Sequence, residues 1–431
     1  MVKFKWETEF KKTEIGEIPK DWEVKVLGQL IKKITKGKVP KKPKKTSKNI
    51  EDFLPYLSVE FLRGEKKEAE YFPRSWGIPV TEEDILIIWD GAANGEILKG
   101  KKGLLSSTVA LIEPNDKVIK KYLFFFLKFF ENELKKLRSG TDDRHVDKQA
   151  LLDFLVTCPP LEEQHRIATI LSWFDDLIEN KRRQNEILEN MAMAIFKSWF
   201  IDFEPFQDEE FVYSEELDME IPKGWEVKPI GEIAEITKGI SYKSDEISDT
   251  KETKEYVVFI TLKCFKRGGG FRPEYKYYLP TAKSRTKNVS VTDGDLIIGI
   301  TDMTPDAKVV GAPALVVIPP WENSGMISLD CAKIQTDSYL KEYLYLFLKL
   351  TQQENSTFAN GVNVLHLNTK LFEQSKYVLL PPKPILDRFH SLVEPLFKKI
   401  ILNEKEIMLL KKARDTLLPQ LVFGRLRVVE I

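Results

Sequence analysis

The side chains in this sequence that could do chemistry are mainly lysines and arginines, and many lie near Gly and Pro. Between Lys32 and Lys48 the chain carries nine lysines without one acidic residue, and two prolines interrupt the run. Grouped ammonium ions can neutralise phosphate charges. A solvated flexible loop explains such a run equally well. In the second half, a smaller basic group surrounds Gly268-Gly269-Gly270, where glycine allows close backbone approach.

Motifs for catalysis are missing. The sequence has no G-x-x-x-x-G-K-[ST] phosphate loop, no strand-linked G-x-G-x-x-G fingerprint and no nucleophile elbow. Cys158, Cys264 and Cys331 stand far apart without a C-x-x-C pair, which predicts buried thiols rather than disulfides or a zinc site. We therefore expect a non-catalytic chain without a metal or cofactor of its own. For His145 and His366 we expect structural hydrogen bonds rather than a catalytic or ligand role.

Composition limits the class of protein. With 431 residues and 42% hydrophobic residues, the chain can form several domains, each with its own core. No apolar run is long enough for a membrane span, and the start lacks the apolar stretch of a signal peptide, so we expect a cytoplasmic protein without membrane contact. The formal net charge of +0 argues at first against nucleic acid. The local basic groups weaken that argument.

One module occurs twice in the chain. The string EIPKDWEVK at 17–25 returns as EIPKGWEVK at 220–228, and VTCPP at 156–160 returns as VLLPP at 378–382. A repeat of this length is a duplicated domain rather than a solenoid unit. Two similar surfaces on one chain favour a partner that is two-fold or bipartite.

Each copy has the pattern of a mixed α+β domain followed by a long helix. Short apolar runs bounded by Gly, Pro and Asn predict strands, and a longer aromatic or aliphatic stripe predicts a helix. In the first copy these are strands at 54–62, 84–89 and 104–112 and a helix at 118–137. In the second copy they are strands at 256–262, 295–301 and 314–318 and a helix at 339–350.

A long amphipathic helix is predicted after each Pro-Pro pair, because proline is tolerated at a helix start. Apolar residues then alternate at spacings of three and four, as in a coiled-coil seam. The seam positions are Ile167, Leu171, Phe174, Ile178, Lys181, Leu188, Phe389, Val393, Leu396, Ile400, Asn403 and Leu410. The polar members Lys181 and Asn403 would fix the register of two helices that pair with each other. Separate packing of each helix on its own domain is the alternative.

The string PPLEEQHRIATIL at 159–171, together with the two Ile-Pro-x-x-Trp-Glu-Val openings, resembles the specificity (S) subunit of type I restriction-modification enzymes over essentially the whole chain. The resemblance implies two target-recognition domains, each reading half of a bipartite double-stranded DNA site. It also implies an antiparallel helical spacer with pseudo-two-fold symmetry. In this family the subunit has no catalytic residues, and two methyltransferase (modification) subunits dock to it and bring S-adenosylmethionine. Whether motor-nuclease (restriction) subunits also join stays open.

The corresponding domains are target-recognition domain 1 at 1–158, a central helical spacer at 159–204, target-recognition domain 2 at 205–380 and a C-terminal helical spacer at 381–431. The second copy, PPKPILDRF at 381–389, departs from the family string because it lacks the Glu-Glu-Gln. A contact of Glu163 and Gln164 required in both halves is therefore in doubt. A helix-cap role in the first half fits equally well.

Candidate DNA-binding residues are the basic and polar side chains of loops, since lysines neutralise phosphates while loop side chains read base edges. They are Lys36, Lys38, Lys41, Lys42, Arg63, Arg74 and Arg144 in the first domain, and Lys238, Tyr242, Lys243, Lys263, Lys266, Arg267, Arg272 and Asn363 in the second. A two-domain protein-binding scaffold that never contacts DNA is the alternative function. Salt-dependent binding to duplex DNA separates the two.

Overall fold

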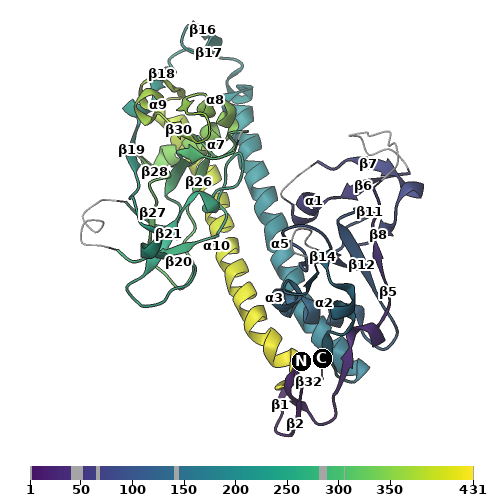
Figure 1. Ribbon diagram of the computed structural model, residues 1–431. Helices are drawn as coiled ribbons and strands as arrows, with labels where there is room; N and C mark the ends of the chain where they lie inside the picture. Colours follow the sequence, from purple (N-terminus) through teal and green to yellow (C-terminus); the bar gives the residue numbers. More distant parts are fainter. Residues whose placement is uncertain are drawn as a thin grey trace. The chain divides into compact units, whose positions relative to one another are not determined.

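The two sequence copies fold into units with matching strand orders. The computed structural model describes residues 2–39, 52–64, 68–139, 145–280, 289–304 and 306–430. Unit 1 consists of residues 1–176 and 411–431, and unit 2 of residues 177–410. Two 40-residue helices, α5 (Leu161–Phe200) and α10 (Lys383–Val422), each contribute to both units (Figure 1). The helical regions proposed as separate segments are thus divided between the units.

Unit 1 is built on a four-stranded antiparallel sheet in the order β10-β9-β12-β5. Its strands are β5 (Ile31–Lys36), β9 (Ile85–Ile88), β10 (Ile97–Lys99) and β12 (Val109–Pro114). Alternate residues of β9 enter different cores, as expected for the two faces of a strand. Ile85 and Ile87 pack with Tyr122 of helix α2 (Lys120–Phe129), whereas Leu86 packs with Leu57.

A second sheet of unit 1 has the order β7-β6-β11-β8 and contains one parallel pair, β6 with β11. Smaller ribbons and helices complete the unit. The strands of the second sheet are β6 (Phe53–Leu57), β7 (Tyr71–Pro73), β8 (Pro79–Val80) and β11 (Gly103–Leu105). The remaining elements are β1 (Lys3–Trp6), β2 (Phe10–Thr13), β3 (Gly16–Pro19), β4 (Glu23–Val26), β13 (Arg138–Ser139), β14 (His145–Val146), β15 (Leu155–Cys158), β32 (Leu426–Glu430), α1 (Val59–Arg63), α3 (Glu131–Leu134) and α4 (Lys148–Leu152).

Unit 2 repeats this order and adds one strand, β20, at the edge of its second sheet. Its first sheet, β19-β28-β24-β26, is antiparallel, and its second, β20-β22-β21-β27-β23, again contains one parallel pair, β21 with β27. The sheets comprise β19 (Ala234–Lys238), β20 (Ile247–Ser248), β21 (Val257–Ile260), β22 (Lys276–Tyr278), β23 (Ser290–Val291), β24 (Leu296–Gly299), β26 (Pro313–Leu315), β27 (Gly325–Ile327) and β28 (Cys331–Thr336). The other elements are β16 (Phe211–Ser214), β17 (Met219–Pro222), β18 (Glu226–Pro229), β25 (Thr301–Asp302), β29 (Ala359–Asn360), β30 (Leu365–Leu367), β31 (Tyr377–Leu380), α7 (Lys341–Leu350), α8 (Gln352–Ser356) and α9 (Thr369–Ser375).

Three predicted strands are interrupted in the structure. The strand expected at 54–62 ends at Leu57, because the Ser58 hydroxyl accepts a hydrogen bond from the Phe61 N–H and starts helix α1. The strand expected at 104–112 divides into β11 and β12, which lie in different sheets. The strand expected at 295–301 likewise divides into β24 and β25. Apolar runs alone do not show where a chain changes sheet.

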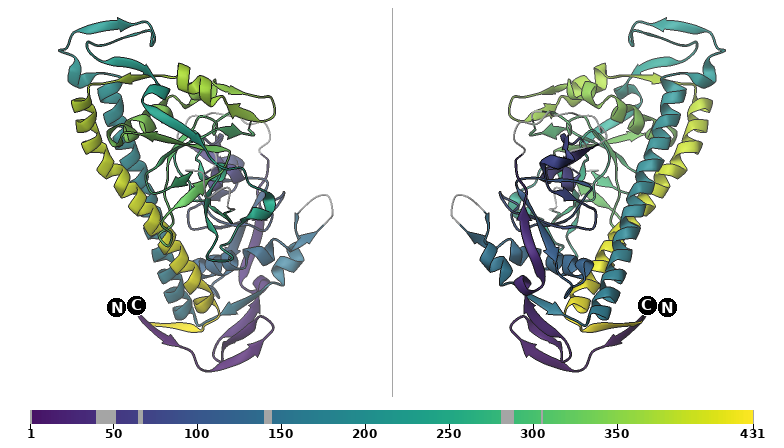
Figure 2. Two further views of the ribbon diagram at one scale, coloured as in Figure 1. Left: turned by 90° about the vertical axis from the view of Figure 1, so that its left-hand side faces the viewer. Right: turned by 90° about the vertical axis from the view of Figure 1, so that its right-hand side faces the viewer.

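Two helical predictions also differ from the structure. The helix expected at 118–137 divides into α2 and α3 at Phe130, whose φ of −90° and ψ of 17° interrupt the helix. The C-terminal helical region ends at Val422, and β32 then pairs antiparallel with β1. Figure 2 shows this ribbon, which joins the two ends of the chain.

The two long helices run antiparallel in both units, which confirms the predicted pairing. In unit 2, residues near 185 of α5 contact residues near 403 of α10, while Phe200 packs on Phe389. In unit 1, Asp175 pairs with Arg414 at 2.6 Å. The predicted seam residues are all buried or half-buried: Ile167, Leu171, Phe174, Ile178, Lys181, Leu188, Phe389, Val393, Leu396, Ile400, Asn403 and Leu410.

A polar layer interrupts the apolar seam within unit 2. The Asn403 Nδ2 donates to Asn185 Oδ1 at 2.9 Å, and the Asn185 Nδ2 donates to Glu404 Oε1 at 2.9 Å. Lys181 Nζ donates to Asn403 Oδ1 at 3.3 Å and forms an ion pair with Glu406. Because a shift of one turn would leave these buried amides without partners, the layer disfavours other helix registers.

An ion cluster around the buried Glu163 joins the chain ends to the start of α5 in unit 1. Arg427 of β32 contacts Glu163 at 2.6 Å, Glu7 at 2.7 Å and Asp21 at 2.9 Å. Its guanidinium lies 5.6 Å from the ring centroid of Trp22, whose indole N–H donates to Glu163 at 3.2 Å. Because the Glu163 side chain is only 3% exposed, removing Arg427 would leave a buried carboxylate without its cation.

Gln164 has a similar internal role. Its Oε1 accepts a hydrogen bond from the Ile119 N–H at 2.8 Å, and its Nε2 donates to the Pro159 carbonyl at 2.9 Å. Glu163 and Gln164 therefore face the interior of unit 1. From the sequence we considered either a contact required in both halves or a helix-cap role for this pair. The structure instead shows both side chains bound to other parts of unit 1.

Replacing Arg427 with Ala is expected to lower the free energy of unfolding by about 3 kcal/mol, because Glu163 loses its buried partner. The matched control is Lys3→Ala, which removes an ion pair with Glu430 in the same ribbon that is 66% and 59% exposed. The control should cost less than about 1 kcal/mol. Urea unfolding measures both. Equal losses in the two variants would contradict the internal role of the cluster.

A pH dependence follows from Glu7. Backbone N–H groups of Glu9 and Thr8, and then Arg427, lower the pKa of Glu7 from 4.5 to about 2. Its folded pKa lies below its unfolded one, so this stabilisation is present above about pH 4.5 and is lost as the pH falls toward 2. Thermal unfolding from pH 6 to pH 2 should show a steeper decline for the unaltered chain than for Glu7→Gln. Parallel curves would contradict the assignment.

Candidate nucleic-acid interface

Strand register brings equivalent residues to the same sheet end in both units. In unit 1, Lys36 lies opposite Ala110, which lies opposite Ile87, and Asp90 follows three residues after Ile87. In unit 2, the matching residues are Lys238, Ala332 and Ile298, and Thr301 follows three residues after Ile298. Backbone hydrogen bonds thus set a lysine and a short polar side chain at corresponding places.

A histidine completes each site. His145 forms an antiparallel bridge with Asp90, and His366 lies opposite Thr301 in the ribbon of β25, β30 and β29. These contacts give the hydrogen bonds that were predicted for the two histidines. We call each lysine, short polar residue and histidine an edge triad: Lys36, Asp90 and His145 in unit 1, and Lys238, Thr301 and His366 in unit 2.

The glycine after each triad lysine is required by close packing. A Cβ on Gly37 would lie 2.1 Å from the Ser106 carbonyl oxygen, and one on Gly239 would lie 2.2 Å from the Ser328 carbonyl oxygen. Any larger residue would therefore push the following segment away from the sheet. The Thr-Lys-Gly sequence in both copies is explained by this approach, which fixes where the chain leaves the sheet.

In the unit 1 triad, the Asp90 carboxylate has two partners. Lys36 Nζ lies 2.6 Å from Asp90 Oδ2, and His145 Nδ1 lies 2.5 Å from Asp90 Oδ1. The side chains of Lys36 and His145 are 43% and 45% exposed, whereas Asp90 is 20% exposed. The less exposed Asp90 carboxylate thus orients the more exposed Lys36 ammonium and His145 imidazole.

The unit 2 triad is less charged. The Thr301 hydroxyl lies 3.4 Å from His366 Nδ1, and His366 and Lys238 are exposed. Thr301 is itself buried. The same backbone arrangement therefore presents a different set of hydrogen-bonding groups in each unit.

Next to Thr301, the Asp302 carboxylate accepts several hydrogen bonds. Burial alone would raise the pKa of Asp302, but hydrogen bonds from Thr304 and the backbone of Val309 and Val310 outweigh it and lower the pKa. These bonds tie Thr304, Val309 and Val310 to the Asp302 carboxylate.

The basic residues of this region meet at Asp306. Arg267 forms an ion pair with Asp306, and Lys308 lies 3.8 Å from the same carboxylate. The Gly268 N–H donates to the Lys308 carbonyl at 2.7 Å. Gly268, Gly269 and Gly270 have φ values of 82°, 110° and 108°, a conformation that favours glycine. Exposed Lys266 completes the group.

Other predicted DNA-binding residues are more dispersed. Arg63 pairs with Glu96, and the Arg272 Nε donates to the Lys263 carbonyl at 2.9 Å. The Tyr242 ring packs edge-on against Phe259 at 5.0 Å and is half-buried. Of the rest, Lys38, Arg74, Lys243, Lys263 and Asn363 are exposed, while Lys41, Lys42 and Arg144 lie outside the described residues.

Sequence reasoning missed Asp90, Thr301 and Lys308. The signal was available for the first two, because Asp90 and Thr301 follow the aligned strands that begin after Asp84 and Asp295 at equal distances. Because the first copy has Asp and the second has Thr at this position, the residue types alone gave no reason to select it.

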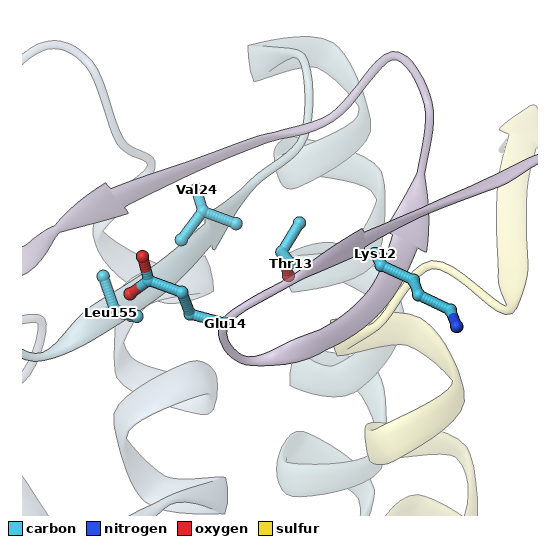
Figure 3. Close-up of a pocket in the computed structure, with 5 residues that line it drawn as sticks. All are labelled: Lys12, Thr13, Glu14, Val24 and Leu155. Atoms are coloured by element: carbon cyan, nitrogen blue, oxygen red, sulfur yellow. The ribbon is translucent and has the colours of Figure 1, made fainter.

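A surface hollow in unit 1 offers no comparable group. It is lined by Lys12, Thr13, Glu14, Val24 and Leu155 (Figure 3). In Figure 3 the Lys12 ammonium and the Glu14 carboxylate point to opposite sides, so they do not form one charged site.

Neither metal chemistry nor thiol chemistry is indicated. Within the described ranges, no group of three His, Cys, Asp or Glu residues could hold a metal ion. Burial raises the pKa of Cys158 to about 11 and of Cys264 to about 12, and Cys331 is buried as well. Among the helices that the structure describes, none is long and apolar enough to cross a membrane.

Comparisons with known proteins agree with the duplicated arrangement. The family described as the type I restriction modification DNA specificity domain matches residues 19–190 and again 222–412. The chain belongs to this family. The MjaIX type I restriction enzyme specificity subunit of Methanocaldococcus jannaschii is 36% identical over 459 residues, covering 100% of this chain and 99% of the relative. The MjaVIII specificity subunit of the same organism is 31% identical, with 99% and 98% covered.

A solved structure supports the fold. The S subunit of a type I restriction-modification system from M. genitalium matches with a TM-score of 0.55 and 18% identity, covering 93% of this specificity-family chain and 96% of that one. The predicted architecture of two similar recognition domains and two long helices is therefore confirmed for this chain by its two family matches and its own fold.

Replacing Gly37 with Ala should destabilise unit 1 by about 1–3 kcal/mol, because the added methyl group overlaps the Ser106 carbonyl. The control Gly77→Ala places its methyl group 3.4 Å from the Leu104 side chain, an ordinary contact, and should change stability little. Thermal unfolding compares the two. If Gly37→Ala has the same melting temperature as the control, the backbone at position 37 does not lie as close to the Ser106 carbonyl as described.

Proposed function

We propose that this chain is the sequence-specific DNA-recognition subunit of a type I restriction-modification complex and that each unit reads one half of a bipartite duplex site. The observation that carries the proposal is the edge triad, which recurs at the same sheet end of both units with one residue changed. Because the triad occupies the same place in both units, both can bind duplex DNA in the same way. Because one residue of the triad differs, the two units can recognise different half-sites.

Local charge supports DNA as the partner even though the net charge is zero. In unit 1, Lys36 of the triad and the nearby Lys38 are both exposed. In unit 2, Lys266, Arg267 and Lys308 gather at the loop that follows Thr301. Lysines and arginines at these places would neutralise phosphates and position the duplex, while the short polar residues and histidines reach base edges.

The proposal assigns the chemistry to other subunits. Two methyltransferase subunits would dock on this chain and bring S-adenosylmethionine, and restriction subunits would join where the complex also cleaves DNA. The chain itself would act without catalytic residues in the cytoplasm. Its contribution is selection of the site, because methylation follows wherever both half-sites are bound.

Exchanging residues 1–158 for the matching domain of a relative should change one half of the methylated motif and leave the other half unchanged. The reciprocal exchange of residues 205–380 is the control and should change only the other half. Sequencing of methylated DNA from cells that carry each complex measures the motif. A change in both halves after a single exchange would reject the assignment of one unit to each half-site.

A further inference from the structure

The histidines of the two edge triads differ in the group that binds Nδ1, and this difference has a chemical consequence. We propose that His145 and His366 each read one base pair, and that Asp90 and Thr301 decide whether the other ring nitrogen, Nε2, accepts or donates a hydrogen bond. The proposal rests on the proposed function and deepens it. It names the residues that make the two half-sites unlike.

Geometry places the two rings alike. In each unit, the triad lysine pairs with an alanine of the middle strand, and that alanine pairs with an isoleucine of the next strand. Asp90 and Thr301 each lie three residues after this isoleucine. Both histidines face these residues through backbone pairing, and in both the Nδ1 atom makes the contact. The His145 side chain is 45% exposed, and His366 is exposed. Among the described residues, Nε2 of neither ring has a hydrogen-bond partner, so it can bind a ligand.

In unit 1, the carboxylate of Asp90 fixes the ring. A carboxylate only accepts hydrogen bonds, so His145 Nδ1 must carry the proton at the 2.5 Å contact with Oδ1. In a neutral imidazole the remaining nitrogen is then an acceptor. An acceptor in the major groove matches the exocyclic amino group of adenine or cytosine.

Lys36 strengthens this arrangement. Its ammonium lies 2.6 Å from the second oxygen of Asp90, so that both carboxylate oxygens have fixed partners and the carboxylate cannot turn away. The lysine is 43% exposed and lies beside the ring, where a phosphate or a base acceptor could reach it. A cation and an acceptor thus stand side by side in unit 1.

In unit 2, Thr301 permits the opposite tautomer. Its hydroxyl can donate to His366 Nδ1, from which it lies 3.4 Å, and the ring proton is then on Nε2. A donor in the major groove matches guanine N7 or O6, thymine O4 or adenine N7. Guanine and thymine present only acceptors there, so they are the bases that distinguish a donor from an acceptor. No carboxylate of the edge triad holds the proton on Nδ1 in this unit.

The test is selection of duplexes from two libraries by the full complex at about pH 8, where an ordinary imidazole is neutral. Each library keeps one half-site of the methylated motif and randomises the other. His145→Ala should reduce the preference at one base pair of the unit 1 half-site by about 5- to 100-fold. The unit 2 half-site should be unchanged, and His366→Ala should give the reverse result. His165→Ala, at an exposed histidine of α5 outside the triads, is the control and should alter neither.

Exchange of the Nδ1 partners tests the tautomer. Asp90→Thr should move the preference at that one position toward guanine or thymine on the strand that is read, while Thr301→Asp should move the unit 2 preference away from guanine and thymine. These variants keep both histidines and the backbone pairing, so they carry the test if a His→Ala chain does not fold.

Two results would overturn the inference. One is an unchanged preference at every base pair in the His→Ala and partner-exchange variants. The other is a uniform loss of binding to all sequences with a shallower salt dependence, which would identify the histidines as phosphate contacts. If the unaltered complex selects no sequence at all, the proposed DNA-recognition function fails instead, so the two failures are distinguishable.

Discussion

The register of three hydrogen-bonded strands in each unit is the constraint on which the rest of the structure depends. β5, β12 and β9 in unit 1, and β19, β28 and β24 in unit 2, fix a lysine relative to a residue two strands away. A slip of one residue would turn every side chain of a strand to the opposite face. β9 and β24 are buried along their whole length. The slip is opposed in β5, where Ile31 is buried and the lysines are exposed, because turning this strand over would bury lysine side chains. The accessible side chains at the sheet end can then differ without moving the frame.

The frame itself is held in different ways in the two units. In unit 1, Trp22 is enclosed by Glu163 and Arg427, which tie the chain ends to α5 through ionic contacts. In unit 2, Trp225 packs on aromatic rings, with Phe203 at 5.5 Å and Phe206 at 5.1 Å. The residues that replace the Glu-Gln pair there are Ile385 and Leu386, and Leu386 is buried. An ionic cluster with every group paired and an apolar cluster of similar volume are both stable solutions.

Much of this organisation could be predicted from the sequence, because it depends on spacing that is visible in one dimension. Proline pairs marked the starts of α5 and α10, and the three-and-four spacing marked the residues that the two helices bury. Strand ends were harder to predict. Ser58 starts a helix inside an apolar run, and the turn after Leu105 moves the chain to another sheet. Both depend on local hydrogen bonds and on sheet partners far away in the sequence.

The candidate site was predicted only in part for the same reason. Lys36 and Lys238 could be selected as basic residues before a glycine, but their neighbours come from strands and ribbons more than fifty residues away. Asp90 and Thr301 lie at equal distances after aligned strands but differ in type, and the strand register is what places each of them near a lysine. Arg63 also pairs with a carboxylate, that of Glu96, but it does not belong to either triad, and its role in DNA binding stays a prediction. The sequence shows which residues are charged, whereas only the fold shows which of them form ion pairs within the chain.

The central claim is that this chain selects a DNA site through two separate half-site readers. Genome-wide mapping of methylated bases, in cells with and without the gene for this chain, tests it most directly. We predict that methylation disappears at one motif with two specified blocks separated by unspecified bases, and that all other methylation remains. Unchanged methylation, or loss at a motif with a single uninterrupted block, would contradict the account.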